Sequence, residues 1–265
     1  MGDKPVVALA ALHFWEEPSI SGKNGTGAVF FSGCNLGCVY CQNNKISHSD
    51  IGKTVTAYEL CDIYFELKKK GAENISIITG THFLPQIIES IKLAKSKNIS
   101  LPFVYNTSGY EKIEAIEKLS DVIDVFLPDY KYYFVKDSFR YSSCRDYPSV
   151  AFEAILKMVE MKGKPIFENS MIKRGVIIRH LVLPGKIIES KMAIKKLFDK
   201  FANNVYYSIM SQFTPTDNLQ NYPEINRRIT ESEYHSIVDY SVNLGIENAY
   251  IQDLASSDKG FIPNF

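Results

Sequence analysis

Short apolar runs alternate with longer amphipathic segments along most of the chain. Runs of hydrophobic and β-branched residues predict six buried strands, at 27–32, 74–79, 101–106, 122–127, 176–183 and 204–210. Residues 249–251 are a candidate for a short last strand. Between the strands, apolar residues recur at helical spacing. Helices are predicted at 56–70, 84–96, 111–119, 149–161, 189–201 and 231–244.

Six strand–helix units in series predict a parallel sheet, because each helix returns the chain to the same end of the sheet. We expect a single α/β domain with the fold of a partial (β/α)6 barrel of the TIM type, with 27–252 as its core. Residues 1–26 would be an N-terminal extension packed on the barrel, and 253–265 a C-terminal tail. A doubly wound open sheet fits the same pattern. Both folds bind ligands at the carboxyl ends of their strands.

Charge and composition argue against a nucleic-acid-binding, a membrane-spanning or a secreted protein. The chain of 265 residues has 30 basic and 30 acidic residues, and this balance argues against a nucleic-acid partner. No apolar stretch approaches the roughly 18 residues that a membrane span needs. The apolar run after Lys4 ends at Glu16, Glu17 and Pro18 without a cleavage site of small residues, unlike a secretory leader. An odd number of cysteines, five, fits a reducing compartment, so we expect a cytoplasmic protein.

Three of these cysteines, Cys34, Cys38 and Cys41, follow the first predicted strand directly. Thiolates at this spacing can converge on one inorganic centre, and the glycines at 33 and 37 let the loop fold tightly around it. A fully ligated cubane iron–sulfur cluster takes four cysteines. Three local cysteines therefore predict a cluster with one open iron, to which a substrate or cofactor can bind.

Two alternatives remain for this centre. Cys61 or Cys144 could supply a fourth thiolate, although Cys61 falls within a predicted helix. Three cysteines and His48 could instead bind zinc in a closed site, which would make the chain a zinc-stabilised binding protein. Structural zinc sites usually come as paired knuckles, so the single loop favours the cluster without excluding zinc.

The pattern Cys-x3-Cys-x2-Cys, with the aromatic Tyr40 before the last cysteine, resembles the signature of the radical S-adenosylmethionine (SAM) superfamily. The wider chain is similar to the branch related to pyruvate formate-lyase activating enzymes. The segments that carry this likeness are 13–18, 30–43, 126–131, 179–185, 210–215 and 251–265.

The resemblance implies a [4Fe-4S] cluster with three cysteine ligands, whose open iron chelates the amino and carboxylate groups of SAM. Reductive cleavage of SAM then gives methionine and a 5′-deoxyadenosyl radical, which abstracts hydrogen from a substrate carbon. The implied partners are an electron donor such as flavodoxin or ferredoxin and, for an activating enzyme, a glycyl radical enzyme. A small molecule or a peptide is the alternative substrate.

The resemblance also indicates which residues after the later strands face SAM. The superfamily usually has a Gly-Gly-Glu-like segment after its second strand, where this chain has Thr79-Gly80-Thr81-His82. The amino group of SAM would then be held by backbone carbonyls or by the Thr81 hydroxyl, and His82 is a candidate base. An Asp at the position of Asp129 helps activating enzymes to hold a monovalent cation. The expected cofactor-binding residues are Tyr40, Gly80, Thr81, Asn106, Thr107, Asp129, Lys131, Arg179 and Gln212.

Other polar residues have both functional and structural interpretations. Arg179 and His180 interrupt an apolar strand, and one of the two must face inward. A planar guanidinium suits a carboxylate, so Arg179 is expected to bind that of the cofactor or substrate. Asp129 and Lys131 could simply pair with each other. The remaining expectations are a polar lining completed by Thr214, a surface position for Glu16 and Glu17, an aromatic lid at 130–141, and Cys144 as a candidate hydrogen donor to a radical.

Overall fold

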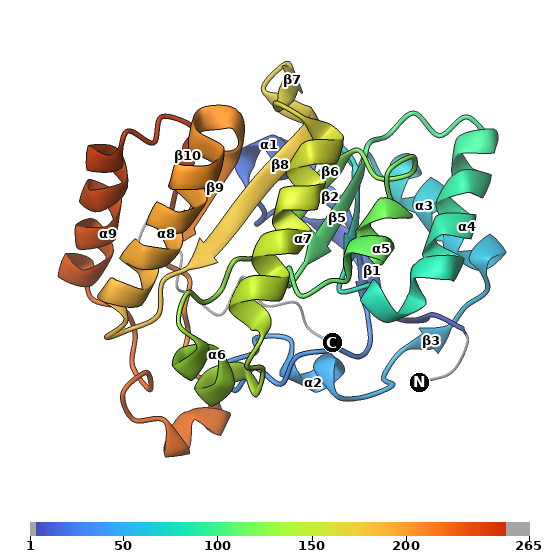
Figure 1. The fold of residues 1–265 in the computed structure, drawn as a ribbon. Helices are drawn as coiled ribbons and strands as arrows, with labels where there is room; N and C mark the ends of the chain where they lie inside the picture. The colour runs from blue at the N-terminus through green and yellow to red at the C-terminus, as the bar shows by residue number, and fades with distance from the viewer. Residues whose placement is uncertain (1–3, 253–265) are drawn as a thin grey trace.

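A computed structural model describes residues 4–252, so the expected C-terminal tail lies outside the described residues. Its centre is a parallel sheet whose strands lie side by side in chain order (Figure 1). These strands are β2 (Thr26–Phe31), β4 (Ile75–Ile78), β5 (Phe103–Thr107), β6 (Val125–Pro128), β8 (Met171–Leu181), β9 (Tyr206–Met210) and β10 (Ala249–Ile251). Sequential order excludes the doubly wound alternative, because that fold reverses direction from a central strand. Within residues 4–252 the sheet does not close, so the fold is a partial barrel, as predicted.

Three further strands were not predicted, and all pair antiparallel. They are β1 (Val6–His13), β3 (Lys53–Thr54) and β7 (Ile166–Glu168). β1 runs beside β2, with Val7 opposite Phe31 and His13 opposite Thr26. Much of the N-terminal segment is therefore part of the sheet, and its end lies at the edge of the barrel interior.

The long helices cover the outer face of the sheet (Figure 1). The long ones are α3 (Ala57–Lys69), α4 (Leu84–Ser96), α7 (Tyr147–Lys162), α8 (Ile187–Phe201) and α9 (Glu231–Leu244). The short ones are α1 (Pro18–Ser21), α2 (Asn44–Ser47), α5 (Ile113–Glu117), α6 (Val135–Ser142), η1 (Thr81–Phe83), η2 (Ala202–Asn204) and η3 (Asp217–Asn221). α3 and α9 each begin with a capping box, in which a threonine and the glutamate three residues later satisfy each other's backbone N–H groups. No helix within residues 4–252 has the length and apolar character that crossing a membrane requires.

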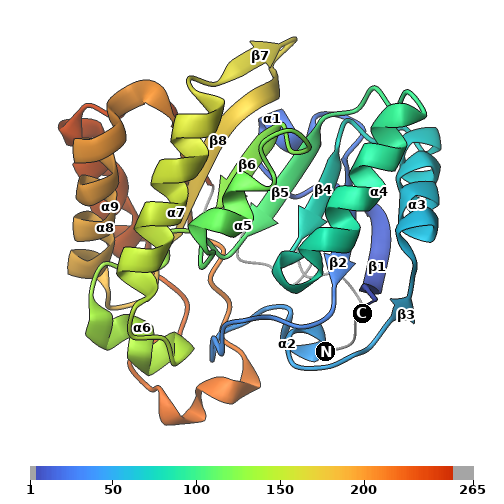
Figure 2. The same cartoon turned by 45° about the vertical axis from the view of Figure 1, so that its right-hand side comes forward.

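Three hydrophobic clusters form the core of residues 4–252, and two of them show how the site is positioned. The largest cluster lies between the strands and the outer helices and includes Leu60, Ile77 and Phe103. A smaller cluster fills the barrel interior, where Ile20 of α1 packs with Val104 and other inward-facing strand residues. This packing closes one end of the interior. The carboxyl ends of the strands open at the other end, where α2 and α6 lie (Figure 2).

Candidate active site

A pocket opens at the carboxyl ends of the strands and has an empty volume of about 1130 Å³ including its mouth. Its wall combines the loop after β2 with the ends of β1, β4, β5, β6, β8 and β9. The polar lining residues are His13, Glu16, Cys34, Cys38, Tyr40, Cys41, Gln42, Asn43, Thr79, Asn106, Thr107, Ser108, Asp129, Lys131, Arg179 and Gln212. The apolar ones are Trp15, Phe30, Leu36, Ile78, Leu181 and Met210.

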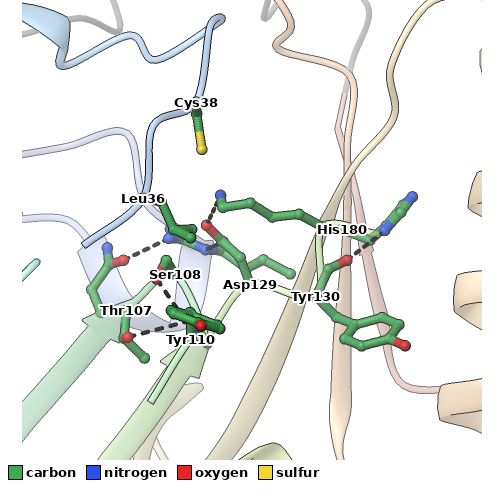
Figure 3. A network of polar contacts seen from close by, with 12 residues as sticks. Leu36, Cys38, Thr107, Ser108, Tyr110, Asp129, Tyr130 and His180 are labelled. Atoms are coloured by element: carbon green, nitrogen blue, oxygen red, sulfur yellow. Dashed lines mark hydrogen bonds and ion pairs between the residues drawn. The ribbon is translucent and has the colours of Figure 1, made fainter. Parts of the chain in front are cut away.

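All three cysteines of the predicted cluster loop line this pocket. Helix α6 holds the loop, because the backbone N–H of Val39 donates to the carbonyl oxygen of Tyr141 at 2.9 Å. The Cys34 sulfur accepts a hydrogen bond from the Leu36 N–H at 3.4 Å, and the Cys38 sulfur lies 2.9 Å from the Ser142 hydroxyl. Figure 3 shows Cys38 pointing from its loop toward the strand ends.

This donor set fits an iron–sulfur cluster. Burial raises the pKa of the Cys34 thiol and raises that of Cys38 to about 12, and a bound metal ion would favour the thiolate form of both. Two of the three sulfurs already have hydrogen-bond partners of the kind that tune cluster sulfurs. Within residues 4–252, no three His, Cys, Asp or Glu side chains are grouped closely enough for a single metal ion. His48 is exposed at the end of α2 and does not line the pocket.

Arg179 is at the centre of a buried polar network on the pocket wall. Its guanidinium donates from Nε to Asp129 Oδ1 at 2.9 Å, from Nη1 to Glu16 Oε2 at 3.0 Å and from Nη2 to Asn106 Oδ1 at 2.6 Å. Asn106 Nδ2 returns a hydrogen bond to Glu16 Oε1 at 3.0 Å. The Lys131 ammonium donates to Asp129 Oδ2 at 2.5 Å, as the i, i+2 spacing predicts. The network joins β5, β6, β8 and the segment after β1.

The charges of this network balance each other. Although burial alone would raise the pKa of Asp129, the positive charges of Arg179 and Lys131 lower it below its usual value. The pKa of Glu16 is raised by burial, against the attraction of Arg179. Arg179 therefore faces inward, as predicted, but its three nitrogens are already bound by side chains of the protein.

The expectation that Glu16 and Glu17 lie at the surface is wrong. The Glu16 side chain is 10% exposed, and Glu17 is buried. The physical reason is the path of the chain, because after β1 it turns into the barrel interior, where Pro18 begins α1 and Ile20 packs in the interior core. Burial also raises the pKa of Glu17. Favourable partners such as Arg179 offset the cost of burying Glu16.

The segment after β4 does not present the predicted side chains to the pocket. Thr79 lines the pocket and has a φ of 59°, whereas the Thr81 hydroxyl turns away and donates to the buried Glu111 at 2.7 Å. Gly80 faces α4, since a Cβ added there would lie 2.5 Å from Ile87. His82 lies 2.8 Å from the Ser32 carbonyl oxygen and is not a lining residue.

Of the other residues predicted to bind the cofactor or line the pocket, most lie in the pocket wall. Tyr40, Asn106, Thr107, Lys131 and Gln212 line the pocket, and Thr214 does not.

His180 points away from the pocket, and its Nδ1 lies 2.8 Å from the Tyr130 carbonyl oxygen (Figure 3). Burial lowers the pKa of His180 to about 4, so it is neutral at pH 7. Cys61 in α3 and Cys144 after α6 are buried and do not line the pocket either. Neither is therefore a fourth ligand in this arrangement.

Sequence reasoning missed several lining residues, namely His13, Trp15, Glu16, Gln42, Asn43, Thr79 and Ser108. The signal for Glu16 was available, because it lies in the segment 13–18 that contributed to the family resemblance. Side chains of neighbouring residues point apart in most backbones, however, so the sequence alone favours a surface position for this pair of carboxylates.

Comparisons with known proteins show which sequences the chain is similar to. The family model described as "Radical SAM superfamily" matches residues 28–186. An uncharacterised protein of Methanocaldococcus jannaschii is 28% identical over 233 residues, which cover 84% of this chain and 63% of that protein. The chain thus spans less than two thirds of this relative. The pyruvate formate-lyase-activating enzyme of Clostridium pasteurianum is 29% identical over 180 residues, 66% of this chain and 68% of that enzyme.

Solved structures share the fold. The FeFe-hydrogenase maturase of Carboxydothermus hydrogenoformans superposes with a TM-score of 0.57 over 83% of this chain and 50% of that one. The two sequences are 14% identical, so this likeness concerns the fold alone.

Proposed function

The chain belongs to the radical SAM superfamily, whose enzymes use a [4Fe-4S] cluster and SAM, and we propose that Cys34, Cys38 and Cys41 bind that cluster and that the pocket binds SAM. When bound, the cluster and SAM supply an organic radical that removes a hydrogen atom from the substrate. The observation that supports the proposal most directly is the meeting of all three cysteines with the Arg179 network in one pocket.

The residues of the pocket have distinct tasks in this proposal. Lys131 gives one of its three N–H donors to Asp129, which leaves donors for the carboxylate of SAM. Arg179 holds Asp129, Asn106 and Glu16 in place and so keeps Lys131 oriented through Asp129. This role differs from the direct carboxylate contact that the sequence suggested.

Neutral residues complete the lining of the pocket. Gln42 donates from Nε2 to the Gln212 carbonyl oxygen at 3.0 Å, which links the cysteine loop to the end of β9. The buried side chains of Leu36 and Met210 give the pocket an apolar wall that excludes water from a reactive intermediate. Flavodoxin or ferredoxin is the proposed class of electron donor.

For the substrate, we propose a backbone glycine of a glycyl radical enzyme. The likeness to the Clostridium pasteurianum activating enzyme supports this choice. The second candidate is a small molecule or a peptide. The Thr79–His82 segment after β4 favours this second candidate. The carboxylate that the superfamily usually has there is absent, and Thr81 points away from the pocket.

The test begins with protein purified without oxygen. We expect a brown protein with iron and sulfide near four per chain, which forms 5′-deoxyadenosine and methionine from SAM when dithionite is added. Replacing Cys34, Cys38 and Cys41 together by alanine should abolish both the colour and the products. A colourless wild type with stoichiometric zinc would contradict the proposal.

The substrate needs a separate experiment. Incubation with a glycyl radical enzyme of the same organism should produce a glycyl radical signal in electron paramagnetic resonance. If no signal forms while SAM is still cleaved, deuterium-labelled small molecules and peptides are the next substrates. Transfer of deuterium into 5′-deoxyadenosine would identify the carbon that is attacked.

A further inference from the structure

A chain of buried hydroxyl groups ends at one of the cluster cysteines. The Cys38 sulfur lies 2.9 Å from Ser142 Oγ, which lies 2.7 Å from the Tyr132 hydroxyl. The Tyr132 hydroxyl lies 2.6 Å from that of Tyr40. Ser142 is 1% exposed, Tyr132 is 0% and Tyr40 is 6%, so bulk water does not compete for these hydrogen bonds.

A thiolate at Cys38 fixes the direction of every hydrogen bond in this chain. A thiolate has no proton, so Ser142 must donate its only hydroxyl proton to Cys38. The Ser142 oxygen can then only accept, and Tyr132 must donate to it. By the same reasoning Tyr40 donates to Tyr132. Three hydroxyl dipoles are thus aligned toward one sulfur, and each hydrogen bond polarises the next.

The backbone keeps Ser142 in this position. Ser142 is the last residue of α6, and its carbonyl oxygen accepts the N–H of Gly37 from the cysteine loop at 3.3 Å. Backbone and side-chain contacts therefore both join the loop to the end of α6. Together they fix the Ser142 hydroxyl beside the Cys38 sulfur.

We propose that Ser142, supported by Tyr132 and Tyr40, is a positioning residue that raises the reduction potential of the cluster through a hydrogen bond to the Cys38 sulfur. The inference rests on the proposed function. Reduction adds one electron to the cluster and makes its sulfur ligands more negative, so a donor stabilises the reduced state more than the oxidised state. Hydrogen bonds to sulfur are among the principal means by which a protein sets such potentials.

The experiment measures the midpoint potential of the anaerobically purified, cluster-loaded protein. A redox titration would be followed by electron paramagnetic resonance of the reduced cluster, without SAM. Ser142→Ala should shift the midpoint to a more negative value. Tyr132→Phe should give a smaller shift in the same direction, because Ser142 still donates but is no longer polarised. Ser142→Thr keeps a hydroxyl and should restore most of the potential.

Ser138→Ala is the matched control. Ser138 is buried one turn earlier on α6, and its hydroxyl donates to the Val135 carbonyl oxygen at 3.1 Å. Its loss perturbs the same helix without touching the cluster loop, and the midpoint should stay at the wild-type value. As a second readout, electron–nuclear double resonance of the wild type should show a coupled proton that exchanges in D2O and is absent in Ser142→Ala.

The results separate this inference from the proposed function. Equal midpoints in wild type, Ser142→Ala and Tyr132→Phe would overturn the inference while the proposed function stands. If Ser142→Ala does not retain a cluster, Tyr132→Phe decides the question by the presence or absence of a negative shift. A wild type that binds no iron–sulfur cluster would overturn both.

Discussion

The carboxylate of Glu16 accepts a hydrogen bond from Nη1 of Arg179 at 3.0 Å, although 163 positions separate the two residues in the chain. The two side chains are 10% and 12% exposed. This pair connects the segment after β1 to β8 across the barrel interior. Arg179 also holds Asp129 and Asn106, so one guanidinium ties together four separate parts of the chain.

Removing Arg179 should therefore destabilise the protein strongly. Arg179→Met leaves Glu16 and Asp129 buried without their main partner, and such uncompensated charge typically costs about 3–5 kcal/mol. Glu16→Gln keeps the shape and part of the hydrogen bonding and should cost about 1–2 kcal/mol. The measurement is the free energy of unfolding from urea denaturation.

The exposed pair of Lys195 and Asp199, at 2.7 Å, is the matched control for this prediction. Asp199→Asn should change the free energy of unfolding by less than about 0.5 kcal/mol, because exposed ion pairs contribute little. If Arg179→Met proved as stable as Asp199→Asn, the network would not have the importance that its burial indicates.

The Glu16–Arg179 pair also illustrates what the sequence does not reveal. The sequence predicts that Arg179 faces inward, because one of two adjacent side chains in a strand must do so and a guanidinium suits a carboxylate. Its partner could not, since no local pattern connects positions so far apart. Whether two adjacent glutamates lie at the surface or in the interior depends on the path of the chain after β1, and only tertiary structure determines that path.

The cysteines should divide into two classes on substitution. Replacing Cys34, Cys38 or Cys41 singly by alanine should remove most of the iron and sulfide, because each supplies one of three protein ligands in the proposed function. Cys61→Ala and Cys144→Ala should keep the cluster, since neither residue lines the pocket. Iron and sulfide analysis with the visible absorption spectrum measures the difference. A cluster lost only in Cys144→Ala would contradict the assignment.

The parallel part of the fold could be predicted well, whereas its antiparallel additions could not. Runs of β-branched residues between amphipathic helices locate every parallel strand, and the bounds expected for α4 and α9 agree with the structure. β1 is an apolar run that a leader peptide could also have, and only its pairing with β2 identifies it as a strand. At Thr79, the φ of 59° decides which neighbours face the pocket, and a threonine rarely adopts that conformation.

Lys131 should control the affinity for SAM. Lys131→Met removes the ammonium that is proposed to bind the carboxylate of SAM, and loss of one such charged hydrogen bond should raise the Kd about tenfold, or about 1.4 kcal/mol. Equilibrium dialysis of cluster-loaded protein with labelled SAM measures this. Lys157→Met, on the outer helix α7, removes an ammonium that pairs with Glu117 at 2.9 Å outside the pocket and should leave the Kd unchanged. Equal affinities in the two variants would exclude the proposed role of Lys131.

Glu233 should make the stability depend on pH under acidic conditions. The carboxylate accepts two hydrogen bonds of 2.7 Å from Arg227 and caps α9 through the Thr230 N–H at 3.0 Å. The hydrogen bonds from Arg227 are the largest cause that lowers the pKa of Glu233, from 4.5 to about 2. Because the folded state favours the carboxylate, its contribution is complete above about pH 4.5 and is lost as the pH falls toward 2.

Glu233→Gln should therefore lower the free energy of unfolding by about 1–2 kcal/mol at pH 7, and the gap to the wild type should narrow as the pH falls below 4.5. Urea denaturation of both proteins at a series of pH values measures this difference in the free energy of unfolding. Glu59→Gln is the matched control, because Glu59 occupies the same position in the capping box of α3 but pairs with an exposed lysine, Lys53, instead of an arginine. At pH 7, the difference in the free energy of unfolding between Glu59→Gln and the wild type should be smaller than that for Glu233→Gln. A gap for Glu233→Gln that stays constant down to the acid transition would show that the Arg227 pair does not hold the carboxylate in its charged form.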